Sequence, residues 1–141
     1  MIDINPNNHN QQTIKETIAI KGIGLHSGKE VEIKLEPAGV DNGVKFIRID
    51  KKNDNVIEAI WSNVSETVLS TTISNDSGLK ISTIEHLMSA LSGLHIDNLN
   101  IYINASEVPI MDGSSRPFVD IIENTGIKVQ NKKCKLLNIK K

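Results

Sequence analysis

Apolar and charged residues alternate strictly from Val31 to Glu36, and the run ends at Pro37. Successive side chains of a β-strand point to opposite faces of a sheet, so this pattern predicts a strand with one face in a core and one in water. Shorter runs of the same kind predict further strands. These runs are 17–20, 44–49, 56–61, 67–74 and 99–103. The chain is therefore expected to build its core on one side of a sheet.

Two other segments have helical spacing. Apolar residues recur at positions i, i+3, i+4 and i+7 of one segment, which predicts a helix over 83–94. They are Ile84, Leu87, Met88 and Leu91. Ser82 and Glu85 fit a capping box at the start of this helix. A second helix is expected from Ser115, with Pro117 in its first turn.

Several strands with two amphipathic helices predict an α+β two-layer sandwich, in which one mostly antiparallel sheet packs against two helices. The length of 141 residues fits one domain. Residues 1–12 are polar and aperiodic and are interpreted as a disordered tail, which leaves 13–133 as the domain. A last strand is expected over 134–139.

Composition excludes several classes of function. The net charge of −1 provides no general field for nucleic acid, and 3% aromatic residues leave few stacking surfaces for single strands. The single cysteine, Cys134, suits a reducing compartment, and the chain is expected to be cytoplasmic. No run approaches the roughly 18 apolar residues of a transmembrane segment, and no signal peptide is expected.

His86 is the first candidate for chemistry. On a helical wheel it lies nearly opposite the apolar face, among Ser89, Ala90 and Gly93. A solvent face normally carries Lys and Glu, whereas small residues admit another backbone, so this side of the helix is interpreted as a second packed face. Spacing alone favours a simpler alternative, with Glu85 as a cap and His86 on the surface. An adjacent Glu-His pair is not a metal motif by itself.

The segment Gly22–Gly28 is dense in glycine and joins two predicted strands, with His26 near its middle. A loop that cradles a phosphate is one interpretation, but the nucleotide P-loop pattern is absent and a strand follows instead of a helix. A tight hairpin is the alternative, and a His in such a loop is more often exposed than functional. Asp112 and Ser114 are expected to form a turn or a cap before the second helix.

Four segments together resemble a known family. They are 22–28, 82–87, 93–98 and 108–114. They occur in the order and at about the separations of the UDP-3-O-acyl-N-acetylglucosamine deacetylases, the LpxC family, which removes an acetyl group in lipid A synthesis, part of lipopolysaccharide production. The resemblance covers about residues 13–141. It implies a zinc-dependent hydrolase of two domains, each resembling ribosomal protein S5 domain 2, with the zinc site between them.

The resemblance also implies roles for single residues. His86 matches the only zinc ligand of the first domain, and Glu85 matches the general base that takes a proton from the attacking water. The other zinc ligands belong to a second domain, whose start corresponds to 134–141. His26, Leu69 and Ser70 match residues on the substrate side of the cavity. Many members have Cys where this chain has Ser70, a departure that removes a soft ligand able to hold a second, inhibitory metal.

With its second domain the chain is expected to act on UDP-3-O-acyl-N-acetylglucosamine, and alone it is expected to be inactive and to hold zinc poorly. Asp112 matches a family Asp expected to be structural. A non-catalytic RNA- or protein-binding domain is the alternative, since the same two-layer fold serves other functions. The near-neutral charge argues against RNA.

Overall fold

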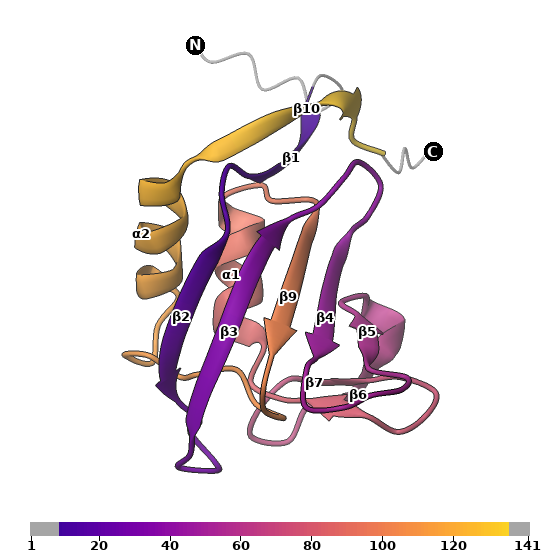
Figure 1. Cartoon of the computed structure of the whole chain (residues 1–141), viewed down its shortest axis with the longest axis vertical. Coiled ribbons are helices and arrows are strands. Elements are labelled where there is room, and N and C mark those ends of the chain that lie inside the picture. The colour runs from indigo at the N-terminus through magenta and orange to yellow at the C-terminus, as the bar shows by residue number, and fades with distance from the viewer. Residues whose placement is uncertain (1–8, 136–141) are drawn as a thin grey trace, which may run out of the picture.

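A five-stranded sheet forms the centre of the computed structural model, which describes residues 9–135 (Figure 1). The strand order is β2-β3-β9-β4-β5, and every neighbouring pair is antiparallel except β4 and β9, which are parallel. The strands are β2 (Ile18–Ile23), β3 (Glu30–Pro37), β4 (Val44–Arg48), β5 (Val56–Glu58) and β9 (Leu99–Ile103). These elements confirm the predicted strands around 17–20, 31–36, 44–49 and 99–103.

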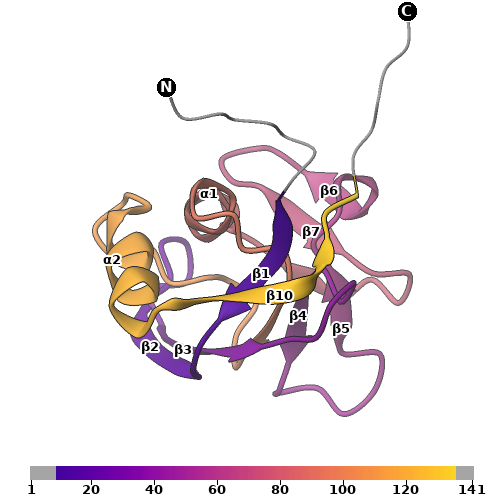
Figure 2. The ribbon, with the colours of Figure 1, turned by 90° about the horizontal axis from the view of Figure 1, so that it is seen from above.

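Two helices cover one face of this sheet, α1 (Glu85–Gly93) and α2 (Arg116–Thr125) (Figures 1 and 2). Pro117 stands in the first turn of α2, where its missing N–H costs nothing, and Gly126 ends the helix at a φ of 97°. Within residues 9–135 neither helix is long and apolar enough to cross a membrane. The α+β two-layer sandwich predicted from the sequence is confirmed.

The core lies between the sheet and the helices. The strand β3 buries Val31, Ile33 and Leu35, while its charged residues point to the other face, as the alternation predicts. That outer face carries three ion pairs between neighbouring charged side chains. They are Lys21–Glu32 at 3.7 Å, Lys34–Glu36 at 2.6 Å and Lys45–Glu58 at 3.7 Å. Such exposed pairs contribute little to stability, and they mark the outer face as one in contact with water.

A second, three-stranded sheet was not predicted. It consists of β6 (Val64–Glu66), β7 (Thr72–Ser74) and β8 (Lys80–Ile81). The predicted strand 67–74 is therefore wrong over 67–71, which form a loop. The predicted strand 56–61 ends at Glu58, and a short 3-10 helix, η2 (Trp61–Asn63), follows it.

A two-stranded ribbon crosses one end of the domain (Figure 2). It pairs β1 (Asn10–Ile14) with β10 (Ile127–Lys133), antiparallel. The interpretation of 1–12 as a tail is thus wrong over 10–12; residues 1–8 lie outside the described residues. The predicted strand 134–139 is not a strand at Cys134 and Lys135, and the rest of it lies outside the described residues.

Buried polar side chains explain why a polar segment forms β1. Asn98 is 1% exposed, and its side-chain nitrogen donates to the side-chain oxygens of Gln11 and Gln130, each at 2.8 Å. Its oxygen accepts the N–H of Gly43 at 2.9 Å. Gln11, Asn98 and Gln130 are called the amide cluster below. Hydrogen-bonded amides can be buried, so polarity does not indicate exposure here.

Candidate active site

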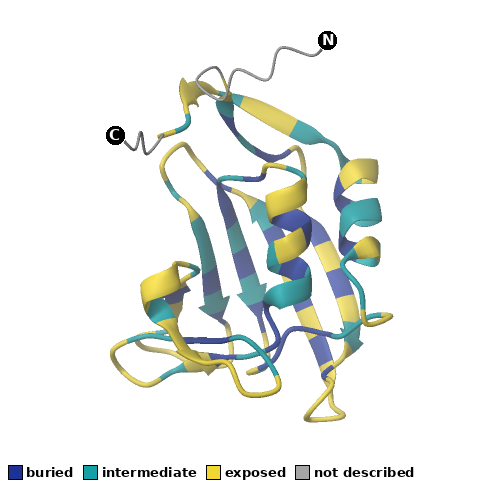
Figure 3. Cartoon of the chain, turned by 180° about the vertical axis from the view of Figure 1, so that it is seen from behind, coloured by how far each residue is buried: buried dark blue, intermediate teal, exposed yellow. Residues whose placement is uncertain are grey.

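Three segments meet at the end of the sheet away from the β1–β10 ribbon, where α1 begins and the β2–β3 hairpin turns (Figures 1 and 3). They are the hairpin loop 24–29, the loop 67–71 and the first turn of α1, and together they are called the site end. All five predicted site residues belong to it: His26, Leu69, Ser70, Glu85 and His86. Hydrogen bonds join the loop 67–71 to the start of α1, and Glu107 accepts hydrogen bonds from the hairpin loop and from Thr83, just before α1.

Glu85 is half-buried and is not a cap. The position before α1 makes no side-chain capping bond, so the predicted capping box is wrong. Instead Oε2 of Glu85 accepts the backbone N–H of Thr71 at 3.0 Å, and the N–H of Ile84 donates to the carbonyl of Thr71. Within residues 9–135, Oε1 of Glu85 has no hydrogen-bond partner. The carboxylate is thus oriented by one oxygen and has the other available for a proton.

His86 follows at the next position and is half-buried, so it is neither in the apolar core nor fully exposed. Ser89 and Gly93 are exposed on the same helix, in agreement with the face of small residues. Ala90, which the sequence places on that face, is 1% exposed and packs in the core instead. The apolar face is therefore wider than predicted, and the small-residue face is narrower.

Leu69 and Ser70 lie in the loop that Glu85 holds. Leu69 is 85% exposed and has a φ of 63°, an uncommon conformation for a leucine. Ser70 is half-buried beside it. The loop breaks the predicted strand because both polar groups of the Thr71 backbone bond to the start of α1 and not to a neighbouring strand. A large apolar side chain is thereby presented to the outside, two residues before the backbone N–H that Glu85 binds.

Glu107, which the sequence analysis missed, holds the hairpin loop. Its side chain is 3% exposed; Oε1 accepts the N–H of His26 at 2.8 Å and Oε2 accepts the N–H of Ser27 at 3.1 Å. The loop N–H groups are therefore occupied by an internal carboxylate, which removes the phosphate-cradling interpretation. No pattern in the sequence points to Glu107, because it lies about eighty residues along the chain from the loop that it holds.

The pKa of Glu107 reflects two opposing influences. Burial is the largest single one and raises the pKa, but the hydrogen bonds from His26 and Ser27 together outweigh it and hold the pKa below its ordinary value. Glu107 is thus an anion at neutral pH. His26 is exposed, and the backbone of its loop is hydrogen-bonded to the negatively charged carboxylate of Glu107.

Thr83 connects this carboxylate to α1. Its hydroxyl donates to Oε1 of Glu107 at 3.3 Å, and its backbone has a φ of 57° although it is β-branched and buried. A backbone of this kind costs on the order of 1–3 kcal/mol and persists only where its surroundings determine it. The neighbouring Ser82 bonds to Ser106 and Val108 on either side of Glu107.

Asp112 has the structural role that the sequence suggests. Its Oδ1 accepts both the N–H of Ser114 at 2.9 Å and the hydroxyl of Ser114 at 2.8 Å. These bonds, with a smaller contribution from the nearby His86, lower the pKa of Asp112. The turn that precedes α2 is thereby closed on the His86 side of the domain.

Metal-ligating side chains are few at the site end. Among residues 9–135 there is no group of three or more His, Cys, Asp or Glu side chains that could hold a metal ion. His86 is the one predicted ligand, and a catalytic zinc site needs about three protein ligands.

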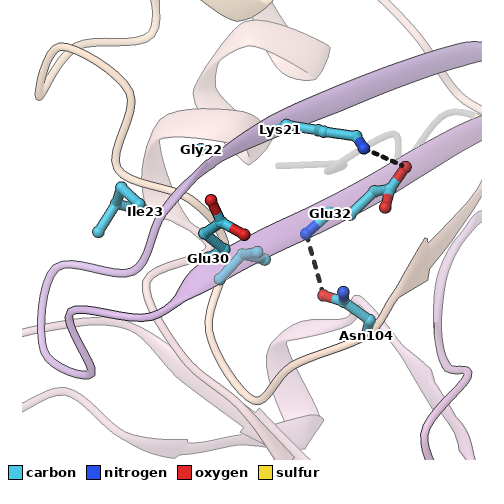
Figure 4. Close-up of a pocket in the computed structure, with 7 residues that line it drawn as sticks. Lys21, Gly22, Ile23, Glu30, Glu32 and Asn104 are labelled. Atoms are coloured by element: carbon cyan, nitrogen blue, oxygen red, sulfur yellow. Dashed lines mark hydrogen bonds and ion pairs between the residues drawn. The ribbon is translucent and has the colours of Figure 1, made fainter.

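A hollow of about 350 Å³ lies elsewhere, at the edge of the sheet (Figure 4). Its lining includes the Lys21–Glu32 ion pair, and Asn104 accepts the N–H of Glu32 at 2.9 Å. These side chains belong to the outer face, so the hollow contains none of the predicted site residues. It offers no competing arrangement of catalytic groups.

The fold and the site end together define an α+β domain that presents an oriented carboxylate, Glu85, next in sequence to an imidazole, His86. Residues 11–141 match the family model described as LpxC, UDP-3-O-acyl N-acetylglycosamine deacetylase. The chain belongs to this family.

Curated relatives support the same assignment. A UDP-3-O-acyl-N-acetylglucosamine deacetylase of Geotalea uraniireducens is 53% identical over 131 residues, which is 93% of this chain and 42% of the relative. Proteins of the same name from Hahella chejuensis and Shewanella pealeana are 50% and 46% identical over the same share of this chain and 43% of their own length. The chain thus spans less than half the length of the relatives it matches.

Proposed function

We propose that this chain supplies the general base and one zinc ligand of a cytoplasmic UDP-3-O-acyl-N-acetylglucosamine deacetylase of lipid A synthesis. The observation that carries the proposal is the Glu85 carboxylate, fixed through Oε2 by Thr71 with Oε1 unengaged, next to the imidazole of His86. A second domain, beginning within 134–141, provides the remaining zinc ligands and completes the site.

The residues present fit a zinc ion in part. His86 is half-buried and stands at the edge of a face of small residues, so its imidazole can reach a metal held jointly with another domain. When bound, zinc supplies Lewis-acid polarisation of the acetamide carbonyl and of the attacking water. Glu85 accepts the proton that this water loses, and the Thr71 N–H keeps the carboxylate oriented while it does so.

The neighbouring loops bind the substrate. His26 stands on the hairpin loop at the substrate side, where an imidazole can donate to an oxygen of the nucleotide sugar. Leu69 presents an apolar wall beside Glu85, and Ser70 lines the same wall. Asp112 closes the turn on the His86 side and takes no direct part.

The test compares the full-length gene product with the chain of residues 1–141. The full-length protein is expected to retain about one zinc after dialysis and to release acetate from the nucleotide sugar, because it has about three ligands. The chain alone is expected to do neither. His86→Ala in the full-length protein should remove most of the zinc, and the exposed Ser89→Ala is the matched control on the same helix. Zinc tightly held by the chain alone, or a full-length protein that releases no acetate, would contradict the proposal.

A further inference from the structure

The hairpin loop 24–29 has few restraints of its own. Its internal bonds run from Gly24 to Lys29, from Gly28 to Gly24 and from Lys29 to Ser27. Within residues 9–135, its hydrogen bonds to the rest of the domain all go to Glu107, from the N–H groups of His26 and Ser27 and from the Ser27 side chain. The place of the His26 backbone therefore depends on one carboxylate.

The surroundings are shaped for that carboxylate. A Cβ atom at Gly24 would lie 2.4 Å from Oγ of Ser27 and 2.5 Å from Oε2 of Glu107, so glycine leaves room here for the Glu107 carboxylate and for the Ser27 hydroxyl beside it. Both carboxylate oxygens face donors, because Oε1 meets the N–H of His26 and the hydroxyl of Thr83 while Oε2 meets the N–H of Ser27. An amide in the same place would turn an NH₂ group toward one of these donors and leave it without an acceptor.

Glu107 also contacts the segment that leads into the other half of the site. Thr83 lies two residues before Glu85, and the backbone of Ser82 is bonded to residues on both sides of Glu107. The same carboxylate thus receives hydrogen bonds from the His26 loop and from the start of α1. No other described side chain bonds to both segments.

We propose that Glu107 is a positioning residue, which fixes the loop carrying His26 relative to Glu85 and His86 by accepting hydrogen bonds from both segments. The inference rests on the proposed function, in which His26 contacts the nucleotide sugar. Glu107 itself is buried and does not touch the substrate. Its loss should therefore act through His26 and should appear mainly in substrate binding.

The first measurement uses amide hydrogen exchange on the 141-residue chain and does not depend on activity. Glu107→Gln is expected to accelerate exchange at His26 or Ser27, whichever amide faces the new NH₂ group, by at least about tenfold, as the net value of a hydrogen bond to a charged group implies. Asn98→Ala is the matched control, because Asn98 is equally buried and also makes three side-chain hydrogen bonds, at the opposite end. Unchanged exchange at His26 and Ser27 in Glu107→Gln would overturn the proposal.

The second measurement is a kinetic double-mutant cycle in the full-length deacetylase. Glu107→Gln should raise KM by about tenfold with a smaller change in kcat, and the effect should vanish in a His26→Ala background, because coupled residues are not additive. Asn98→Ala should leave KM unchanged. Equal effects of Glu107→Gln with and without His26 would overturn the proposal.

If Glu107→Gln does not fold, Glu107→Asp tests the same point, since it keeps the charge but shortens the side chain and draws the carboxylate away from the N–H groups of His26 and Ser27. The same rise in KM is expected, and an unchanged KM would overturn the proposal. A wild-type enzyme that releases no acetate would instead contradict the proposed function, and the exchange measurement would still decide whether Glu107 holds the loop.

Discussion

Each end of the sheet buries a polar side chain with three hydrogen bonds, but the two side chains differ in charge. Asn98 is neutral, and its partners are Gln11, Gln130 and a backbone N–H, so it joins the β1–β10 ribbon to the sheet. Glu107 is an anion, and its partners are two N–H groups of an exposed loop and one hydroxyl. The amide cluster joins two parts of the fold, whereas the Glu107 carboxylate binds a loop with a candidate role in substrate binding.

The largest expected difference is between the effects on kcat of a substitution at the site end and of one in the amide cluster. Glu85→Gln in the full-length protein should lower kcat by roughly 10²–10⁴-fold, the usual contribution of general acid–base groups. The glutamine oxygen can still accept the Thr71 N–H, so the loop 67–71 and the zinc content should be retained. Asn98→Ala should leave kcat unchanged. Steady-state acetate release and elemental analysis provide the measurements, and a Glu85→Gln enzyme with normal kcat would show that Glu85 only holds the loop.

For stability we expect the opposite order: Asn98→Ala should lower the free energy of unfolding more than Glu85→Gln does. Asn98→Ala removes all three bonds of a buried amide and leaves the N–H of Gly43 without its acceptor, while Oε1 of Gln11 keeps only the N–H of Asp41. Unsatisfied buried groups cost about 1–3 kcal/mol, so the free energy of unfolding should fall by about that amount. Glu85→Gln should cost less than Asn98→Ala. Urea denaturation followed by circular dichroism measures both, and equal losses would contradict the contrast between the ends.

The charge difference predicts a difference in pH dependence. The pKa of Glu107 is lowered from its ordinary value of 4.5, so its contribution to stability is complete above pH 4.5 and is lost as the pH falls through the lower, folded-state pKa. The stability gap between wild type and Glu107→Gln should therefore narrow toward pH 3. The gap between wild type and Asn98→Ala should change less, because Asn98 carries no charge and reaches a carboxylate, that of Asp41, only through Gln11. Urea denaturation from pH 7 to 3 tests this, and a constant gap for Glu107→Gln would refute it.

The smallest expected effect is that of adding a thiol at the site end or removing one at the opposite end. Ser70→Cys changes a half-buried side chain by one atom and should alter stability by no more than about 0.5 kcal/mol. It adds a soft ligand at the site end, so inhibition of the full-length enzyme by excess zinc should become stronger. Cys134→Ser at the opposite end is the control and should change neither quantity. Activity titrated with zinc provides the measurement, and identical titrations for Ser70→Cys and wild type would contradict the prediction.

Sequence patterns predicted the strands and helices in which buried and exposed positions recur at a regular spacing. The alternation from Val31 to Glu36 and the helical spacing from Ile84 to Leu91 both report burial on a regular face. They miss β1, because Gln11 is buried by hydrogen bonds and not by apolar contact. The loop 67–71 is missed for a related reason, since Thr71 bonds to Glu85 from a distant element and local composition carries no record of that bond.

The candidate site was predicted unevenly for the same reason. Glu85 and His86 are adjacent in the chain, and the family motif around them is specific, so they were identified together. Glu107 is separated from His26 by about eighty residues and reads locally as one more surface carboxylate. Its burial and its two N–H donors exist only in the folded domain, and no spacing rule could have supplied them.

The β1–β10 ribbon has a consequence for the order of folding. It pairs strands separated by roughly a hundred residues of chain, among the most distant contacts in the described domain. Contacts between such distant segments form slowly, although the entropy of closing a loop grows only with the logarithm of its length. A nascent chain on the ribosome can form the β2–β3 hairpin early, but the ribbon must wait until residues 127–133 have emerged. The end of the domain held by the amide cluster is therefore the last to close during synthesis.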